Sequence, residues 1–110
     1  PTCKPVDFDA YVDTLYKNIN QPGRLEAVMA MLRASKVSSG VRMPKVKQPA
    51  LVLMGSKDPD FKNPIAEAKR VAEALRGNYK IIENAGHYPH AEMPELTIPL
   101  MLDFMNSLKG

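Results

Sequence analysis

A short apolar run that ends at glycine, followed by a helix, constrains the fold of this chain most strongly. The run covers residues 50–54, and Gly55 follows it. A continuous apolar segment of this length is typical of a buried parallel strand. Pro64 then begins a helix that extends to about Arg76, because proline suits a first helical turn and Gly77 lies just beyond the end. The pattern therefore predicts a strand that leads into a helix.

A second strand and a last helix complete this part of the chain. Residues 79–83 form the second predicted strand, so a strand–helix–strand unit with parallel strands is expected. A final helix is predicted within residues 93–109. We place the start of its main part near Thr97, because Pro99 then falls in the first turn, where proline costs little. The expected fold class is α/β, in the order strand, helix, strand, helix.

The residues before this unit are predicted to be helical. Apolar side chains recur at three- and four-residue steps over residues 8–19 and again over residues 24–36. Residues 37–49 are rich in small, basic and proline residues, so we interpret them as a connector. The chain is accordingly divided into a helical segment, residues 1–43, and an α/β segment, residues 44–110.

Composition excludes several classes of function. The net charge of +3 is spread over the chain, so we expect no nucleic-acid partner. The longest apolar run is too short to cross a bilayer, so we expect no membrane partner. Two histidines and one cysteine make no zinc constellation, and we expect neither a metal nor a cofactor. The single Cys3 suggests a reducing compartment, and a cytoplasmic location is expected.

Two residues of catalytic type follow the two predicted strands. Asp58 follows the first strand and His87 follows the second. Neighbouring parallel strands end about 5 Å apart at one edge of a sheet, which is where ligand sites lie in open α/β sheets. There Asp58 can accept a hydrogen bond from one ring nitrogen of His87 and leave the other nitrogen free as a base. Either residue alone is more often a turn or surface residue, so their joint position carries the interpretation.

The segments around these two residues resemble the α/β-hydrolase family. Residues 49–59, PALVLMGSKDP, resemble the family's strand and acid loop, and residues 85–95, AGHYPHAEMPE, resemble its histidine loop and the start of its last helix. The resemblance covers about residues 44–110, and the order acid then histidine fits the family. It implies that Asp58 is the catalytic acid and His87 the general base of a nucleophile–His–Asp triad.

Other polar residues near this pair receive different interpretations. Asp60 is the less favoured acid, because Asp58 occupies the family's position after Gly55. We interpret His90 as a polar residue at the start of a helix near Glu92. Glu92 is predicted to cap or orient the histidine loop.

The resemblance also implies parts that these residues do not contain. The family's nucleophile lies in a Gly-x-Ser-x-Gly turn, and that motif does not occur in the 110 residues. The implied partner is therefore a nucleophile-bearing hydrolase half, in the same chain or in a separate one, and a homodimer is another arrangement. The early helices resemble the end of a cap, which implies a small apolar acyl substrate. Ordinary helix packing explains side chains such as Met29 equally simply.

Three kinds of function stay open on the sequence. The first is an esterase-like hydrolase that cleaves an ester or related acyl bond. The second keeps the fold and changes the reaction to that of an epoxide or haloalkane hydrolase, a lyase, or a cofactor-free oxidase or haloperoxidase. The third is a non-catalytic binding or regulatory module on the same scaffold, because a fold does not determine a function.

Overall fold

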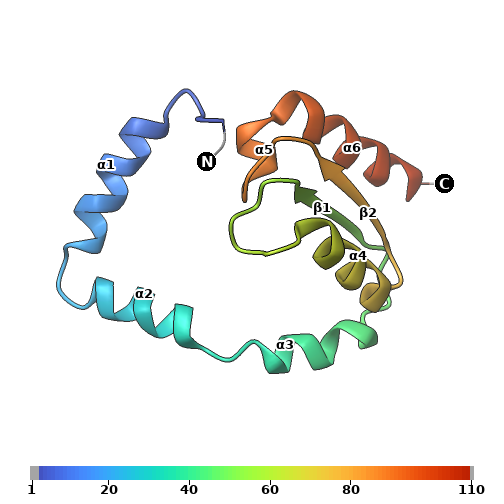
Figure 1. Cartoon of the computed structure of the whole chain (residues 1–110), viewed down its shortest axis with the longest axis horizontal. Coiled ribbons are helices and arrows are strands. Elements are labelled where there is room, and N and C mark those ends of the chain that lie inside the picture. Colours follow the sequence, from blue (N-terminus) through green and yellow to red (C-terminus); the bar gives the residue numbers. More distant parts are fainter. Residues whose placement is uncertain (1–2, 110) are drawn as a thin grey trace. The chain divides into compact units, whose positions relative to one another are not determined.

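Two compact units make up the part of the chain that the computed structural model describes, residues 3–109. The helical unit is Pro5–Val41, and the α/β unit contains the described residues up to Lys4 and from Arg42 onwards. The sequence placed its division after residue 43. Figure 1 shows the elements of both units.

The α/β unit has the expected order of strand, helix, strand and helix, with one additional short helix before the last. Its elements are β1 (Leu51–Gly55), α4 (Pro64–Leu75), β2 (Asn78–Ile82), α5 (Pro89–Glu92) and α6 (Pro94–Ser107). The strands pair in parallel, with Leu51 opposite Asn78 and Gly55 opposite Ile82 (Figure 1). The predicted α/β class and the parallel strand pair are confirmed, and both strands end at the same edge.

Local chemistry at its two ends sets the length of α4. The side chain of Asn63 caps the helix by accepting a hydrogen bond from the Ala66 N–H at 3.0 Å, and Pro64 occupies the first turn. Arg76 adopts a left-handed backbone conformation with φ 52°. A residue in that conformation terminates a helix, so α4 ends at Leu75.

The core of the α/β unit is small and lies where α4 packs on the two strands. Its buried apolar residues are Met54, Ala68, Ala72, Ile82 and Ala85. Ala68 and Ala72 are four positions apart in α4, so they share one face of the helix. Their short side chains allow the helix to approach the strands closely. This packing supports the edge at which β1 and β2 end.

The last helix begins earlier than the sequence suggested. It starts at Pro94 rather than near Thr97, so Pro99 lies inside the helix and removes a backbone donor there. Thr97 is not a cap. Its buried hydroxyl lies 2.9 Å from the carbonyl oxygens of Pro89 and Met93 and donates to them. That contact holds the first turn of α6 against α5 and favours the earlier start.

The helical unit contains α1 (Phe8–Ile19) and α2 (Arg24–Arg33), and α3 (Val37–Arg42) runs to its boundary. A connector over residues 37–49 is therefore wrong for its first half. The hydroxyl of Ser35 accepts a hydrogen bond from the Val37 N–H, which favours the start of a helix. A single 3₁₀ turn, η1 (Met43–Lys45), follows α3.

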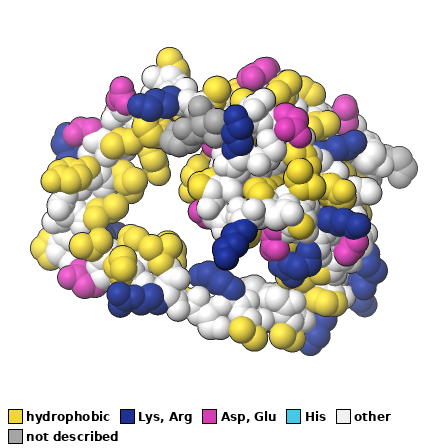
Figure 2. Space-filling view, viewed as in Figure 1, with side chains coloured by type: hydrophobic (Ala, Val, Ile, Leu, Met, Phe, Trp, Pro, Cys, Tyr) yellow, Lys and Arg dark blue, Asp and Glu magenta, His cyan; other side chains and the backbone are white. Residues whose placement is uncertain are grey.

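Side chains of the helical unit are largely exposed. None of the described residues of α1, α2 and α3 is buried. Hydrophobic side chains lie at the surface over α1 and α2 in Figure 2. Among residues 3–109, no helix is both long enough and apolar enough to cross a membrane.

Candidate active site

Backbone hydrogen bonds join the two loops that follow the strands. The loop after β1 donates from the Ser56 N–H to the Ile82 carbonyl at 3.0 Å and from the Lys57 N–H to the Ala85 carbonyl at 2.9 Å. The Ser56 hydroxyl in turn accepts from the Asn84 N–H at 2.8 Å. These bonds extend the contact between the two strands beyond their last ladder pair. The acid loop and the histidine loop are therefore held side by side.

The close approach of the two loops requires a glycine at the end of β1. A Cβ at Gly55 would lie 2.1 Å from the Gly86 carbonyl oxygen and 2.4 Å from the Ala85 carbonyl oxygen. Both contacts are with backbone atoms, so a side chain there would push the histidine loop away. Asn84, with φ 65°, turns the chain after β2 in a conformation that asparagine tolerates better than most residues. These two positions place His87 next to the acid loop.

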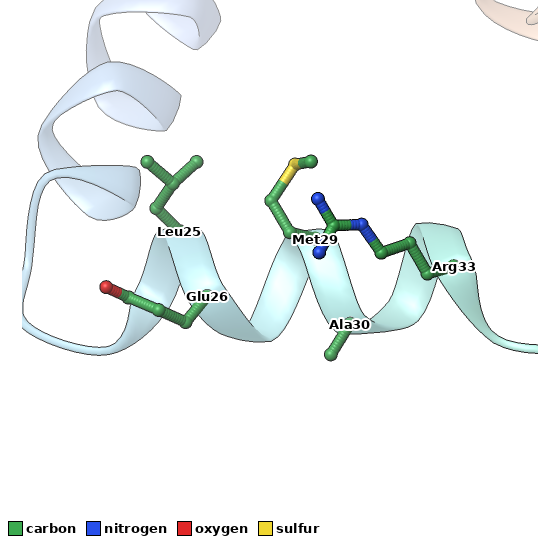
Figure 3. A pocket seen from close by; sticks show the side chains of 5 residues that line it. All are labelled: Leu25, Glu26, Met29, Ala30 and Arg33. Carbon is green, nitrogen blue, oxygen red and sulfur yellow. The ribbon is translucent and has the colours of Figure 1, made fainter.

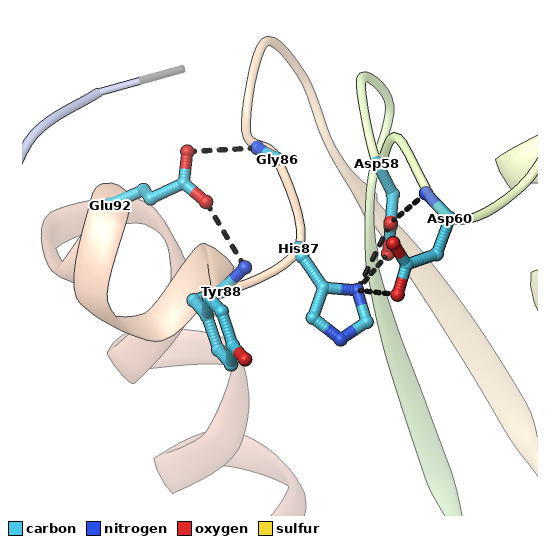
Figure 4. Close-up of polar contacts among 6 residues, drawn as sticks. All are labelled: Asp58, Asp60, Gly86, His87, Tyr88 and Glu92. Atoms are coloured by element: carbon cyan, nitrogen blue, oxygen red, sulfur yellow. Dashed lines mark hydrogen bonds and ion pairs between the residues drawn. The ribbon is translucent and has the colours of Figure 1, made fainter. Parts of the chain in front are cut away.

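Asp58 and His87 form a direct side-chain pair. Nδ1 of His87 lies 3.0 Å from Oδ1 and 2.9 Å from Oδ2 of Asp58 (Figure 4). The Asp58 side chain is 3% exposed, whereas that of His87 is 41% exposed. A proton on Nδ1 donates to the carboxylate, which leaves Nε2 as the basic nitrogen. In Figure 4 this nitrogen points away from Asp58.

Asp60 is a second carboxylate beside the ring. Its Oδ2 lies 3.5 Å from Nδ1 of His87, and its side chain is 62% exposed. Its N–H donates to Oδ1 of Asp58 at 3.0 Å, so Asp60 also helps to orient the closer carboxylate. The shorter distance and the burial favour Asp58 as the partner of the histidine, in the order that the sequence suggested.

The same three residues form the one group in residues 3–109 with the geometry to hold a metal ion. One ligand atom from each of Asp58, Asp60 and His87 lies within 4.8 Å of the others. A count of histidines and cysteines alone did not reveal this group, because two of its ligands are carboxylates. A cation on Nδ1 would replace the proton that His87 donates to Asp58.

Glu92 contacts the histidine loop, as predicted. Its carboxylate, which is buried, accepts hydrogen bonds from the Gly86 N–H and from the Tyr88 N–H, both at 3.0 Å (Figure 4). The ring of Tyr88 lies edge-on to His87, with the ring centroids 4.8 Å apart. His90 is exposed in the short helix α5, in agreement with its interpretation as a polar residue near Glu92.

A shallow hollow in the helical unit contains none of these residues. It is lined by Leu25, Glu26, Met29, Ala30 and Arg33, all from α2 (Figure 3). The hollow has an apolar wall with one acid and one base at its margin. It offers no side chain that acts readily as a nucleophile.

Two of the three comparisons with known proteins gave no match. No family model matches the chain, and no curated protein matches it. Among solved structures, the chain is similar to a predicted CIB-like hydrolase from Thermoplasma acidophilum, at 33% sequence identity and a TM-score of 0.57. The match covers 67% of this chain and 35% of that one, so the chain spans about a third of that hydrolase's length.

The fold, the geometry of the site and the similarity to a solved hydrolase structure together define the class of protein. A parallel strand pair with an acid and a histidine at its carboxyl edge is an α/β arrangement of hydrolase type. With the likeness to a predicted hydrolase, it places the chain in the α/β-hydrolase fold family. The expected resemblance to this family is confirmed.

Proposed function

We propose that this chain supplies the acid and the base of a nucleophile–His–Asp triad in an esterase-like hydrolase. One observation carries the proposal: a buried carboxylate, Asp58, binds Nδ1 of a half-exposed His87 and leaves Nε2 to face outward. A purely structural histidine would not need its second nitrogen accessible. The pair lies at the sheet edge at which catalytic residues of α/β folds are found.

The proposed reaction cleaves an ester or related acyl bond in two stages. Nε2 of His87 takes the proton of the nucleophile's hydroxyl as its oxygen attacks the substrate carbonyl, and the imidazolium then protonates the leaving alcohol. In the second stage His87 takes a proton from water, whose oxygen attacks the carbonyl carbon of the acyl–enzyme, and the bond from that carbon to the nucleophile's oxygen breaks. The proton returns to the nucleophile when the acid product leaves. Asp58 keeps the ring in the required tautomer and stabilises its charged form.

The nucleophile is proposed to come from residues outside this sequence, in the same protein or in a separate chain. The similar hydrolase supports this, because the match covers only 35% of its length. The two-stranded sheet supports it as well, since an isolated strand pair is marginally stable. The alternative arrangement is a homodimer that pairs through the open edge of the sheet, which would not supply the nucleophile because a second copy lacks the same motif.

A small apolar acyl group is the proposed substrate feature. Support comes from the exposed apolar side chains of the helical unit, for example Tyr16, Met31 and Leu32. A cytoplasmic location is also proposed, supported by Cys3, which is free and exposed.

The decisive experiment compares the wild-type protein, with any chain that co-purifies, with a His87→Ala variant. Native mass spectrometry first establishes which chains are present, and hydrolysis of short p-nitrophenyl esters is then measured. We expect kcat to fall by about 10⁴-fold or more, because the remaining groups lose their general base. His90→Ala, three residues further on and exposed, is the matched control and should retain activity.

A His87→Ala variant that is as active as wild type would refute the proposed role. A wild-type sample that contains this chain alone, and that neither hydrolyses esters nor reacts with a serine-directed phosphonate probe, would favour a non-catalytic module instead.

A further inference from the structure

A second buried carboxylate holds the histidine loop from the side opposite to Asp58. Glu92 is 7% exposed. Its Oε1 accepts from the Tyr88 N–H and its Oε2 from the Gly86 N–H, each at 3.0 Å. The two residues that flank His87 in the chain are therefore bound by the two different oxygens of one carboxylate, as Figure 4 shows.

The backbone that carries Glu92 is itself fixed. The Glu92 N–H donates to the Tyr88 carbonyl at 2.9 Å, and the Met93 N–H donates to the Pro89 carbonyl at 2.9 Å. Thr97, which is 1% exposed, donates its hydroxyl to the Pro89 carbonyl as well. The carboxylate thus projects from the end of a short helix that is tied to the first turn of α6.

Two hydrogen bonds to Glu92 restrain the histidine loop more strongly than one bond would. Hydrogen bonds from N–H groups to a carboxylate are roughly twice as strong as bonds between neutral groups. Bonds to the amides on both sides of His87 fix the direction in which its side chain leaves the backbone. Asp58 then fixes the rotation of the ring through Nδ1. Together the two carboxylates leave Nε2 one position from which to transfer a proton.

We propose that Glu92 is a positioning residue for His87, acting through the loop backbone to aim Nε2. A third amide, the Cys3 N–H, donates to Oε2 at 3.2 Å, so the segment that leads into the helical unit is attached to the same carboxylate. This inference rests on the proposed function for its catalytic consequence, but the geometry that it predicts is measurable without catalysis.

The test uses two variants and a matched control. Glu92→Gln keeps the size of the side chain, but it directs an NH₂ group at one of the loop amides in place of an acceptor. Glu92→Asp keeps the charge and shortens the reach. Glu95→Gln removes an exposed glutamate from the first turn of α6 and serves as the control.

The first readout is the ¹⁵N and ¹H spectrum of the His87 ring. In wild type and in Glu95→Gln, we expect a single Nδ1–H tautomer with a slowly exchanging proton. In Glu92→Gln, we expect that proton to exchange at least about tenfold faster, because a mobile loop opens the bond to Asp58 more often. In the assay for hydrolysis, kcat should fall by about 10- to 100-fold with KM nearly unchanged, since a misplacement of 1 Å has an effect of this order. Glu92→Asp should lie between Glu92→Gln and wild type.

Each result decides the proposal. A folded Glu92→Gln variant with wild-type ring spectrum and kcat would overturn it. If Glu92→Gln does not fold, wild-type hydrogen exchange decides: the Gly86 and Tyr88 amides must be protected, and rapid exchange of both would overturn the proposal. If the wild-type sample has no hydrolytic activity, the proposed function fails while the ring spectrum still decides the role of Glu92.

Discussion

The two units of this chain bury their side chains very differently. In the α/β unit, a few small residues such as Ala68 and Ala72 are almost fully buried, and two carboxylates lie beneath the surface with their hydrogen bonds made. In the helical unit, none of the described residues of α1 to α3 is buried, and large apolar side chains face outward. The contrast shows that the candidate site is built within one unit by backbone contacts. The large apolar side chains of the helical unit stay exposed, because none of the described elements covers them.

The largest loss of stability is expected from a methyl group added to a glycine of the α/β unit. Gly55→Ala places Cβ against the backbone of the histidine loop, and the loops must separate. We expect a loss of about 3 kcal/mol in the free energy of unfolding, together with loss of the hydrogen bond between His87 and Asp58. Urea unfolding measured by circular dichroism gives the first quantity, and the His87 ring spectrum gives the second.

Gly40→Ala in α3 is the matched control in the other part of the chain. A Cβ at Gly40 meets nothing within 4 Å, and alanine favours a helix, so a gain of about 0.5 to 1 kcal/mol is expected. Equal effects of the two substitutions would contradict the idea that the loops need close contact at Gly55.

A smaller effect is expected from removal of one buried hydroxyl. Thr97→Val keeps the shape of the side chain but removes its hydrogen bonds to Pro89 and Met93, whose carbonyls keep backbone partners. We expect a loss of about 1 kcal/mol. Thr14→Val in α1 removes a similar bond to Ala10 at an exposed position, and its effect should be close to zero. Unfolding midpoints of the two variants that do not differ would argue against a supporting role for Thr97.

The smallest effect should come from a surface ion pair. Arg70 donates two hydrogen bonds to the carboxylate of Glu67 and lowers the pKa of that group. Because the folded-state pKa lies below the unfolded value, the pair contributes stability at neutral pH, and this is lost as the pH falls through the folded pKa. Glu67→Gln should therefore lower the unfolding midpoint slightly at pH 7, and the difference from wild type should shrink as the pH falls through the lowered pKa of Glu67. A difference that does not shrink as the pH is lowered would exclude this explanation.

The sequence was sufficient to predict the central pair of the site for a topological reason. Asp58 and His87 each follow a strand, and parallel neighbours must end at the same edge, so their proximity does not depend on detail. The contact between Glu92 and the loop was predictable for a similar local reason, since a short turn separates the two.

Other features depend on tertiary contacts that carry no local signal. The Cys3 N–H donates to Glu92, which is 89 positions away in the sequence, and no sequence pattern near either residue indicates this contact. The need for glycine at position 55 arises from the passing backbone of the other loop. The early start of α6 depends on the buried Thr97 hydroxyl, which outweighs the preference of Pro99 for a first turn. In this last case local propensity yields to tertiary packing.

In the sequence, the helical unit lies between two parts of the α/β unit. The first part ends at Lys4 and the second begins at Arg42. The helical unit is therefore an insertion in the topological sense, flanked by two junctions. Segments of this kind can be exchanged or resized with limited thermodynamic consequence, because the entropy of closing a loop grows only slowly with its length. The bond from Cys3 to Glu92 anchors the first junction beside the histidine loop. Exchange of Pro5–Val41 for another segment would therefore alter the helical unit while the hydrogen-bonded pair of Asp58 and His87 stays within the α/β unit.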